Sequence, residues 1–464
     1  MSFASRRVSP GRFHRLLPMA GLLVALFLPN LSWLPPAHAA VPPLDEIGAY
    51  PEPDDLGGLH FYLVTVDVGN RLWDNFGHTA LRMRDEAGGA DIVFNWGGFD
   101  TGGGMAGFAL GFFLGELNYR LFTVPTAQAY AQYRAEERTV WEDRINLNNA
   151  EKANLHRRLM WNLEPENLVY EYDYFDENCT TRLRDYLDEV LDGRLSRRFT
   201  GMTGTTYRQV VQSHYESLSA VAMLLDIGMN SNIDRAMSEW EAMFLPLSLR
   251  RELLGAHSDV ALNGERLPLL AESRVVAQFP PPARQWNAYP VFMLILASLL
   301  IWLLLTTRKP RYSRHMDSSH SRQRASLPPA GYQVLGALIL ICSVFSGLLG
   351  CLMLGSWFWS GHEDLHHNLN LLIFWPTDLL GIALSLRLLL LKSPWPLDRY
   401  SAPYANYYLL AHLLGIAAHA IIHFAGLSEQ NLTNVILWLA APMALFTILV
   451  WLRGFRPAEN AIVM

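Results

Sequence analysis

The sequence predicts an exported α+β domain followed by an α-helical membrane domain with several spans. Hydrophobic residues make up 51% of the 464 residues and charged residues only 17%. Soluble domains carry about 25% charged residues, so part of the chain is expected to lie in lipid. The N-terminus has the pattern of an export signal, and the long apolar runs that follow it are confined to the C-terminal part of the chain.

The first 39 residues are expected to be a signal peptide or an uncleaved anchor. Arg6, Arg7, Arg12 and Arg15 precede an apolar stretch over residues 16–28, and Ala-His-Ala ends at position 39. A basic start, an apolar stretch and small residues before a cleavage site are typical of secretory signals. We therefore expect the chain that follows to be exported.

Residues 45–285 have the composition of a globular domain, and a Phe-Pro-Pro-Pro run at 279–282 ends them as a stiff linker. Residues 286–464 are expected to form the membrane domain. A helix needs about 20 residues to cross a bilayer. Five apolar runs of suitable length predict five spans, at residues 288–306, 332–355, 371–391, 404–426 and 434–452.

Charge in the connecting loops predicts the topology of these spans. The connector 308–324 holds six basic residues, and the positive-inside rule places it in the cytoplasm. Basic residues after the third and fifth spans fall on the same side. The loop that contains His362, His366 and His367 falls outside, so we expect it to share one face of the membrane with the exported domain.

Two functional classes find no support in the composition and motifs. The net charge is −6 and both signs are spread along the exported domain, which argues against nucleic-acid binding. The sequence has neither a phosphate-binding loop nor a dinucleotide-binding fingerprint. We expect no nucleic-acid partner and no cofactor.

Cys179 is the strongest candidate for a reactive side chain. Apolar residues recur after it at helical spacing, and Gly193 ends the pattern, so the thiol is expected in the first turn of a helix. Free amides and the positive end of the helix dipole would favour the thiolate there. Cys342 and Cys351 fall inside an apolar run, which leaves Cys179 without a disulfide partner. The alternative is a buried, inert thiol.

His78 is the candidate base for this thiol. Residues 59–67, 77–84 and 91–96 are predicted strands, with a turn at 86–89, and these place His78 and Asn95 on neighbouring strands. Catalysis by a Cys–His pair needs a base within about 2.6–3.2 Å of the sulfur and a polar group that orients the base. We predict Asn95 as that group.

Asp67, Asp74 and Asn75 remain alternatives to Asn95, because the sequence does not fix the register of the strands. The apolar stretch 106–114 is too short to span a membrane. It is expected to be a buried helix of the exported domain or a lip that dips into the bilayer.

These motifs carry a resemblance to a known family. The segments Asn75–Arg82, Phe94–Gly97, Pro165–Asn167 and Tyr172–Arg182 resemble the periplasmic domain of the Lnb-type bacterial lipoprotein N-acyltransferases, and the likeness continues over Asp226–Pro246. The order of His before Cys also resembles the permuted papain-like fold of the NlpC and lecithin:retinol acyltransferase group. A shorter likeness in the membrane half includes His362 and the run from Asn368 to Leu372.

The resemblance implies a bacterial inner-membrane enzyme with its catalytic domain in the periplasm. Cys179 would take a fatty acyl chain from a phospholipid as a thioester and pass it to the N-terminal amine of a diacylglyceryl lipoprotein, with His78 as the base. Substrate-binding residues are expected in the cysteine motif and in the membrane half. They are Asn178, Thr180, Arg182, Asn368 and Asn370.

Two other functions stay open at this point. A peptidoglycan-directed cysteine peptidase or amidase of the same fold would have an identical nucleophile. A membrane metalloprotein could instead hold iron or zinc through the histidines of the membrane half. These are His362, His366, His367, His412, His419 and His423. Interhelical hydrogen bonds explain such histidines equally well, and we expect no metal site.

Overall fold

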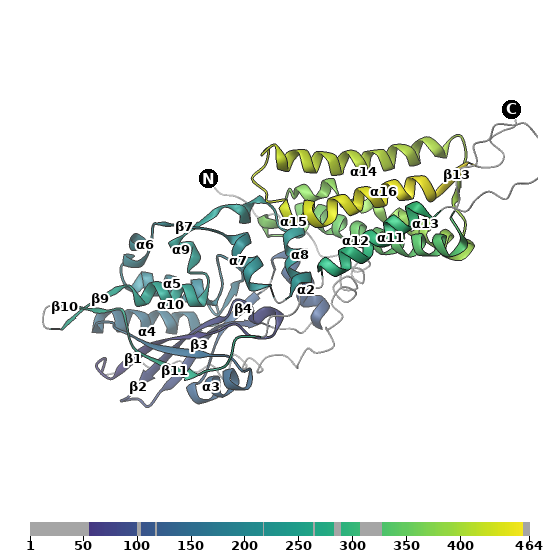
Figure 1. Cartoon of the computed structure of the whole chain (residues 1–464). Coiled ribbons are helices and arrows are strands. Elements are labelled where there is room, and N and C mark those ends of the chain that lie inside the picture. The colour runs from purple at the N-terminus through teal and green to yellow at the C-terminus, as the bar shows by residue number, and fades with distance from the viewer. Residues whose placement is uncertain are drawn as a thin grey trace, which may run out of the picture. The chain divides into compact units, whose positions relative to one another are not determined.

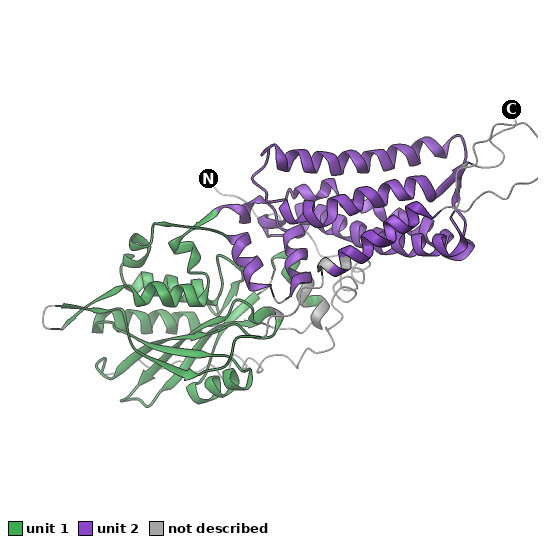
Figure 2. Ribbon diagram, viewed as in Figure 1, with its two compact units in different colours: residues 1–206, 236–283 green, residues 207–235, 284–464 purple. Residues whose placement is uncertain are grey.

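The computed structural model describes residues 55–99, 104–116, 118–216, 218–262, 265–282, 289–306 and 327–457. The predicted signal peptide and the basic connector 308–324 lie outside the described residues. The chain forms two compact units, one of residues 1–206 and 236–283 and the other of residues 207–235 and 284–464 (Figure 2).

The first unit is built on one seven-stranded antiparallel sheet (Figure 1). Its strand order is β11-β5-β1-β2-β3-β4-β6. The three strands predicted between residues 59 and 96 are confirmed as β1, β2 and β3. The strands are β1 (Leu59–Val66), β2 (His78–Asp85), β3 (Asp91–Phe99), β4 (Asn118–Pro125), β5 (Val140–Ile145), β6 (Val169–Glu171) and β11 (Leu270–Ala277).

Helices cover both faces of this sheet. Successive side chains of a strand point to opposite faces, so Phe61 and Leu63 enter one buried cluster and Val64 and Val66 another. The first cluster also takes side chains from α4, α5, α10 and the short helix α6 (Arg194–Arg198), and the second takes them from α3. The helices are α3 (Thr126–Ala135), α4 (Asn149–Leu163), α5 (Cys179–Val190) and α10 (Pro246–Leu254).

A buried amide joins the sheet to two of these helices. The Oδ1 atom of Asn162 in α4 accepts hydrogen bonds from Nε1 of Trp96 in β3, at 2.9 Å, and from the hydroxyl of Tyr186 in α5, at 2.7 Å. All three side chains are buried. Because α5 begins at Cys179, this amide helps to fix the helix that carries the thiol.

Smaller elements complete the first unit. The predicted apolar helix is present as α2 (Gly104–Leu114), and Phe112 is 39% exposed, so α2 is not a fully buried helix. The other elements are η3 (Leu72–Asp74), α6 (Arg194–Arg198), β7 (Met202–Thr206), β8 (Ala236–Ser238), α9 (Glu239–Ala242), β9 (His257–Leu262) and β10 (Glu265–Pro268).

The second unit contains the membrane half together with residues 207–235, a segment that the sequence predicted to lie within the domain 45–285. This segment holds α7 (Tyr207–His214), α8 (Ser219–Gly228) and η4 (Ser231–Asp234). The remaining elements are α11 (Tyr289–Leu305), α12 (Pro329–Trp359), η5 (Glu363–Leu365), η6 (Leu369–Leu372), η7 (Pro376–Leu380), α13 (Gly381–Leu391), β12 (Trp395–Leu397), α14 (Ser401–Phe424), α15 (Thr433–Val435), η8 (Ile436–Ala440), α16 (Ala441–Arg453) and β13 (Phe455–Pro457).

The described residues contain three helices long and apolar enough to cross a membrane, at 329–359, 401–424 and 433–453. The predicted third span is not one straight helix, because residues 363–372 and 376–391 form a pair bent by 59°. Trp375 is extended before Pro376, as the residue before a proline usually is. If this pair counts as one span, the described residues contain up to four spans. The helix α11, with 17 residues, is shorter than the three spanning helices.

The buried amide of Asn162 gives a test of the first unit. Asn162→Ala removes the acceptor of two buried donors, each of which costs about 1–3 kcal/mol when unpaired. We expect the free energy of unfolding to fall by about 2–6 kcal/mol, measured by denaturant unfolding of the detergent-solubilised chain. Asn154→Ala, at an exposed position of the same helix, is the control. Equal stability of the two variants would contradict the assigned role.

Candidate active site

Cys179 is the first residue of α5, as predicted, and Asn178 caps the helix. The Oδ1 atom of Asn178 accepts from the backbone N–H groups of Thr180, at 2.7 Å, and Thr181, at 3.0 Å. The Thr181 hydroxyl accepts in turn from the Asn178 N–H at 2.8 Å. The expectation that free amides surround the thiol is therefore wrong for these two positions, because their cap already occupies them.

A pair of buried threonines places His78 beside Cys179. The hydroxyls of Thr79 and Thr180 lie 3.0 Å apart, although the two residues are 101 positions apart in the chain. Thr79 follows His78 in β2, and Thr180 follows Cys179 in α5. Before β2, Gly77 has a φ of +81°, and a Cβ there would lie 2.8 Å from the Val66 carbonyl oxygen. Glycine is thus required where the chain turns to present His78.

The thiol of Cys179 and the imidazole of His78 are hydrogen-bonded to each other. Burial is the largest influence on the thiol and opposes its ionisation. The charge of His78 and hydrogen bonds from His78, the Thr79 N–H and the Thr180 hydroxyl outweigh it, and they lower the pKa of Cys179 from 9.0 to about 7. A substantial fraction of the thiol is therefore ionised at neutral pH.

The same pairing acts on the imidazole in the opposite direction. Burial favours neutral His78, but the charge of Cys179 and hydrogen bonds to Cys179 and Asn95 outweigh it and raise the pKa of His78 above its usual 6.5. An imidazolium and a thiolate thus stabilise each other. This pairing is the state in which a cysteine is a strong nucleophile.

Asn95 lies where an orienting group is needed. In the antiparallel register of β2 and β3, Ala80 pairs with Asn95, and the Nε2 atom of His78 donates to Asn95 Oδ1 at 3.0 Å. This bond leaves Nδ1 of His78 to face the sulfur. The same oxygen accepts from the hydroxyl of Tyr133 at 2.9 Å. Tyr133 was not predicted, because nothing in the sequence indicates which side chain of α3 reaches β3.

The three alternatives to Asn95 are engaged elsewhere. Asp74 pairs with Arg71 at 2.6 Å and with Arg138 at 3.4 Å. Asn75 donates to the Arg71 carbonyl at 3.1 Å, and Asp67 accepts from the neighbouring Val68 N–H at 2.8 Å. The geometry therefore brings together Cys179, His78 and Asn95.

The predicted binding residues of the cysteine motif make contacts within the fold. Asn178 caps α5, and Thr180 bonds to Thr79. Arg182 pairs with Glu177 at 2.7 Å. Its guanidinium lies over the ring of Tyr170, 4.3 Å from the ring centroid. A role of these residues in substrate binding stays a prediction.

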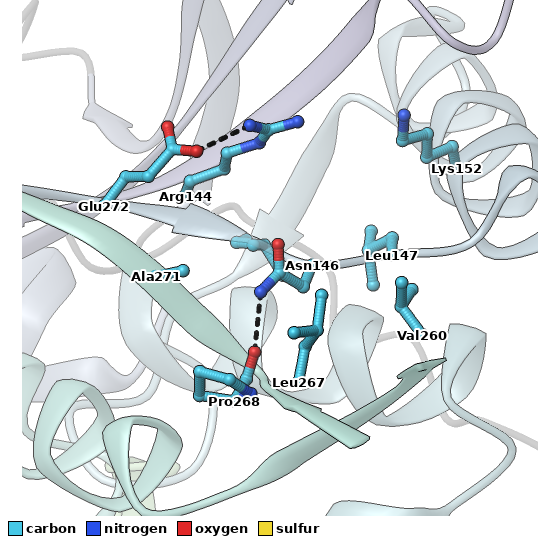
Figure 3. Close-up of a pocket in the computed structure, with 10 residues that line it drawn as sticks. Arg144, Asn146, Leu147, Lys152, Val260, Leu267, Pro268, Ala271 and Glu272 are labelled. Carbon is cyan, nitrogen blue, oxygen red and sulfur yellow. Dashed lines mark hydrogen bonds and ion pairs between the residues drawn. The ribbon is translucent and has the colours of Figure 1, made fainter. Parts of the chain in front are cut away.

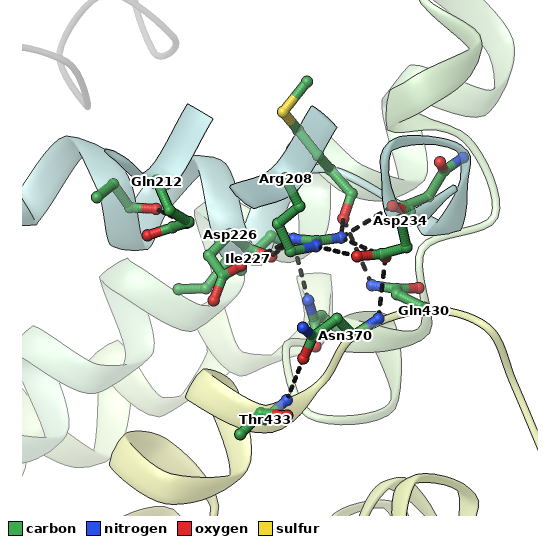
Figure 4. Close-up of polar contacts among 12 residues, drawn as sticks. Arg208, Gln212, Asp226, Ile227, Asp234, Asn370, Gln430 and Thr433 are labelled. Carbon is green, nitrogen blue, oxygen red and sulfur yellow. Dashed lines mark hydrogen bonds and ion pairs between the residues drawn. The ribbon is translucent and has the colours of Figure 1, made fainter. Parts of the chain in front are cut away.

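Asn368 and Asn370 belong to the second unit, where both are buried. Their Nδ2 atoms each donate to the carbonyl oxygen of Ile227 in α8, at 2.8 Å (Figure 4). Gln430 donates to Asn368 Oδ1 at 3.0 Å, and His419 bonds to Asn370 Oδ1 at 2.9 Å. These amides thus fasten α8 to the membrane half, and a role in substrate binding stays a prediction.

A buried ionic cluster holds residues 207–235 together, and Asn230 ties them to the membrane half. Arg208 in α7 pairs with Asp226 at 2.8 Å and with Asp234 at 2.6 Å (Figure 4). The side chain of Asn230 donates to the carbonyl oxygens of Glu363, at 2.8 Å, and His366, at 2.6 Å. The loop of the membrane half that contains Glu363 and His366 is therefore tied to residues 207–235.

The six candidate histidines of the membrane half, all among the described residues, do not converge on a metal-binding arrangement. His366 bonds to the Ser360 carbonyl at 3.0 Å, His412 to Asp378 at 2.8 Å, and His419 to Asn370. No group of three or more His, Cys, Asp or Glu side chains able to hold a metal ion occurs in the part of the chain that the structure describes.

A cavity of about 440 Å³ lies away from the Cys–His pair (Figure 3). Arg144, Lys152 and Glu272 are among its lining residues, and Arg144 pairs with Glu272 at 2.7 Å. The cavity adjoins Ile145, which pairs with Phe61 near the start of β1, whereas His78 pairs with Val66 at the other end of β1. We assign it no role in the chemistry of Cys179.

The shared acceptor of Asn368 and Asn370 predicts a non-additive effect. In either single alanine variant, the Ile227 carbonyl keeps one of its two side-chain hydrogen bonds. The double variant, with both Asn368→Ala and Asn370→Ala, loses both donors to this carbonyl in a buried site. We would measure the rate at which trypsin cuts the segment 207–235. The fold-increase of this rate in the double variant should exceed the product of the fold-increases in the two single variants. Asn431→Ala, at an exposed position, is the control. A double variant as resistant as this control would refute the assignment.

Comparison with known proteins gives one match, and it covers the residues of this site. Residues 51–213 match the family model described as the Lnb N-terminal periplasmic domain, and the match includes His78, Asn95 and Cys179. No curated protein and no solved structure gives a significant match, so the permuted papain-like fold stays a prediction. This part of the chain, residues 51–213, is thus similar to the N-terminal periplasmic domain of the Lnb family.

Proposed function

We propose that the protein moves a fatty acyl chain from a phospholipid, through a thioester on Cys179, to the N-terminal amine of a diacylglyceryl lipoprotein. The observation that carries this proposal is the hydrogen-bonded thiol and imidazole of Cys179 and His78 inside a domain similar to the Lnb N-terminal periplasmic domain. The domain and the membrane helices agree with a lipoprotein-modifying protein at a membrane. We place that membrane at the bacterial inner membrane.

In the first half-reaction, the thiolate of Cys179 attacks the carbonyl carbon of a phospholipid ester. A carbon–sulfur bond forms, and a tetrahedral intermediate carries the negative charge on oxygen. When the intermediate collapses, the carbon–oxygen bond of the ester breaks. The imidazolium of His78 gives its proton to the departing lysophospholipid oxygen, which leaves a thioester and a neutral imidazole.

In the second half-reaction, the neutral N-terminal amine of the acceptor attacks the thioester. His78 takes a proton from the attacking nitrogen as the carbon–nitrogen bond forms and the carbon–sulfur bond breaks. The products are an amide and the original thiolate–imidazolium pair. Asn95 and Tyr133 keep the imidazole in the orientation that serves both steps.

A membrane-bound chain suits this chemistry. The acyl donor and the acyl acceptor would both be held at the bilayer surface. Attaching the catalytic domain to the same surface raises the effective concentration of both substrates without further contacts. The exposed Phe112 of the apolar helix α2 would suit a domain that meets lipid.

Replacing the three cysteines one at a time tests the nucleophile. We expect Cys179→Ala to abolish N-acylation of a diacylglyceryl lipopeptide in phospholipid vesicles, measured by mass spectrometry of the peptide. Cys342→Ala and Cys351→Ala are matched controls in the second unit and should retain transfer. Transfer by Cys179→Ala at the wild-type rate would refute the assignment, and release of peptides from cell-wall fragments without acyl transfer would favour the peptidase alternative.

The pH dependence of thiol alkylation tests the ion pair. Only the thiolate reacts with iodoacetamide, so its rate at Cys179 should rise with pH around a midpoint of about 7. His78→Ala removes the charge that lowers this pKa while the opposing effect of burial remains. We expect its midpoint to move up to 9 or above.

His60→Ala is the control for this experiment, because His60 lies on β1 and contacts Arg144. Its alkylation midpoint should remain at about 7, the wild-type value. The Cys342→Ala, Cys351→Ala background removes signal from the other thiols. An unchanged midpoint in His78→Ala would show that the imidazole does not activate the sulfur.

A further inference from the structure

The hydroxyl of Tyr170 is a buried polar group that lacks a partner among the residues that the structure describes. Tyr170 is only 6% exposed, and its hydroxyl finds no hydrogen-bond partner within the described residues. Leaving such a group unpaired costs about 1–3 kcal/mol, and folded proteins rarely do so without a reason. By contrast, the buried hydroxyls of Tyr133 and Tyr186 each donate to an asparagine oxygen.

Tyr170 lies against the part of α5 that carries the thiol. It is in β6, which precedes the short loop leading to Cys179. Arg182 follows Cys179 by three positions and so shares its helix face, and its guanidinium lies 4.3 Å from the Tyr170 ring centroid. Cys179 itself packs against the buried cluster that contains Tyr170.

Electrostatics keep this hydroxyl protonated. Burial, and after it the charge of Cys179, raise the pKa of Tyr170 well above its usual value. The hydroxyl therefore does not act as a base near neutral pH, and it can donate a hydrogen bond to negative charge that forms beside the sulfur.

A second donor lies next to the sulfur. The N–H groups of Thr180 and Thr181 donate to the Asn178 side chain, and the N–H of Arg182 donates to the Asn178 carbonyl. The N–H of Cys179 is the remaining amide of this first turn, and it belongs to the same residue as the sulfur that attacks. Developing charge next to Sγ is favoured at this end of the helix.

We propose that Tyr170 is a catalytic residue whose hydroxyl, together with the Cys179 N–H, binds the oxyanion of the tetrahedral intermediate. This inference rests on the proposed acyl transfer through Cys179. As the thiolate adds, the π electrons of the carbonyl move to its oxygen, which accepts both hydrogen bonds, and no proton is transferred to it. When the electrons return, the alcohol oxygen leaves with the proton from His78.

Two reactions at the same sulfur test this role in the full-length chain. Acylation of Cys179 by p-nitrophenyl butyrate passes through an oxyanion, whereas alkylation by iodoacetamide does not. Removing one oxyanion donor typically lowers a rate about 10²–10³-fold. We expect Tyr170→Phe to lower the acylation rate by about this factor, with the alkylation rate and its pH midpoint as in the wild type.

Tyr130→Phe is the matched control, because it removes a buried hydroxyl of α3 that donates to Glu142 in β5. It should lower the thermal midpoint of unfolding and leave acylation at the wild-type rate. Acylation of Tyr170→Phe at the wild-type rate would overturn the inference, and an equal fall in acylation and alkylation would show that Tyr170 only positions the thiol. A wild-type chain that is alkylated but never acylated would overturn the proposed function itself.

Discussion

The hydrogen bond between the hydroxyls of Thr79 and Thr180 is the contact on which the geometry of the candidate site depends. It is buried, and it joins β2 to the first turn of α5 across 101 positions of the chain. Each threonine follows one member of the Cys179–His78 pair. Asn178 caps the start of α5, and the amide of Asn162 bonds to Tyr186 further along this helix. Together they hold α5 in the position that places the thiol next to the imidazole.

Burial and charge act against each other in this pair, and charge prevails. A buried thiol or imidazole by itself would favour its neutral form. Side by side, Cys179 and His78 each stabilise the ionised form of the other, and the bond from His78 to Asn95 adds to the effect. Tyr133 holds Asn95 from α3, on the opposite face of the sheet from α5. The chemistry therefore depends on both layers of helices.

Local patterns were enough to predict the parts of the site that are close in sequence. Helical spacing after Cys179 and the stop at Gly193 predicted that the thiol lies in the first turn of α5. A short turn predicted that His78 and Asn95 lie on neighbouring strands. Tyr133 and Tyr170 were missed because their contacts are made between distant elements. The assignment of residues 207–235 to the second unit depends on Ile227 and Asn230, which meet partners far along the chain. The bend at Pro376, by contrast, could have been predicted from the proline itself.

The central claim is that Cys179 carries the acyl chain covalently, and the intact mass of the chain tests it most directly. The full-length protein would be incubated with a single defined phospholipid in the absence of an acceptor amine. We expect a mass increase of one acyl chain, located on the peptide that contains Cys179 and removed by hydroxylamine. An unmodified Cys179 in a chain whose thiol still reacts with iodoacetamide would contradict a covalent role for this cysteine.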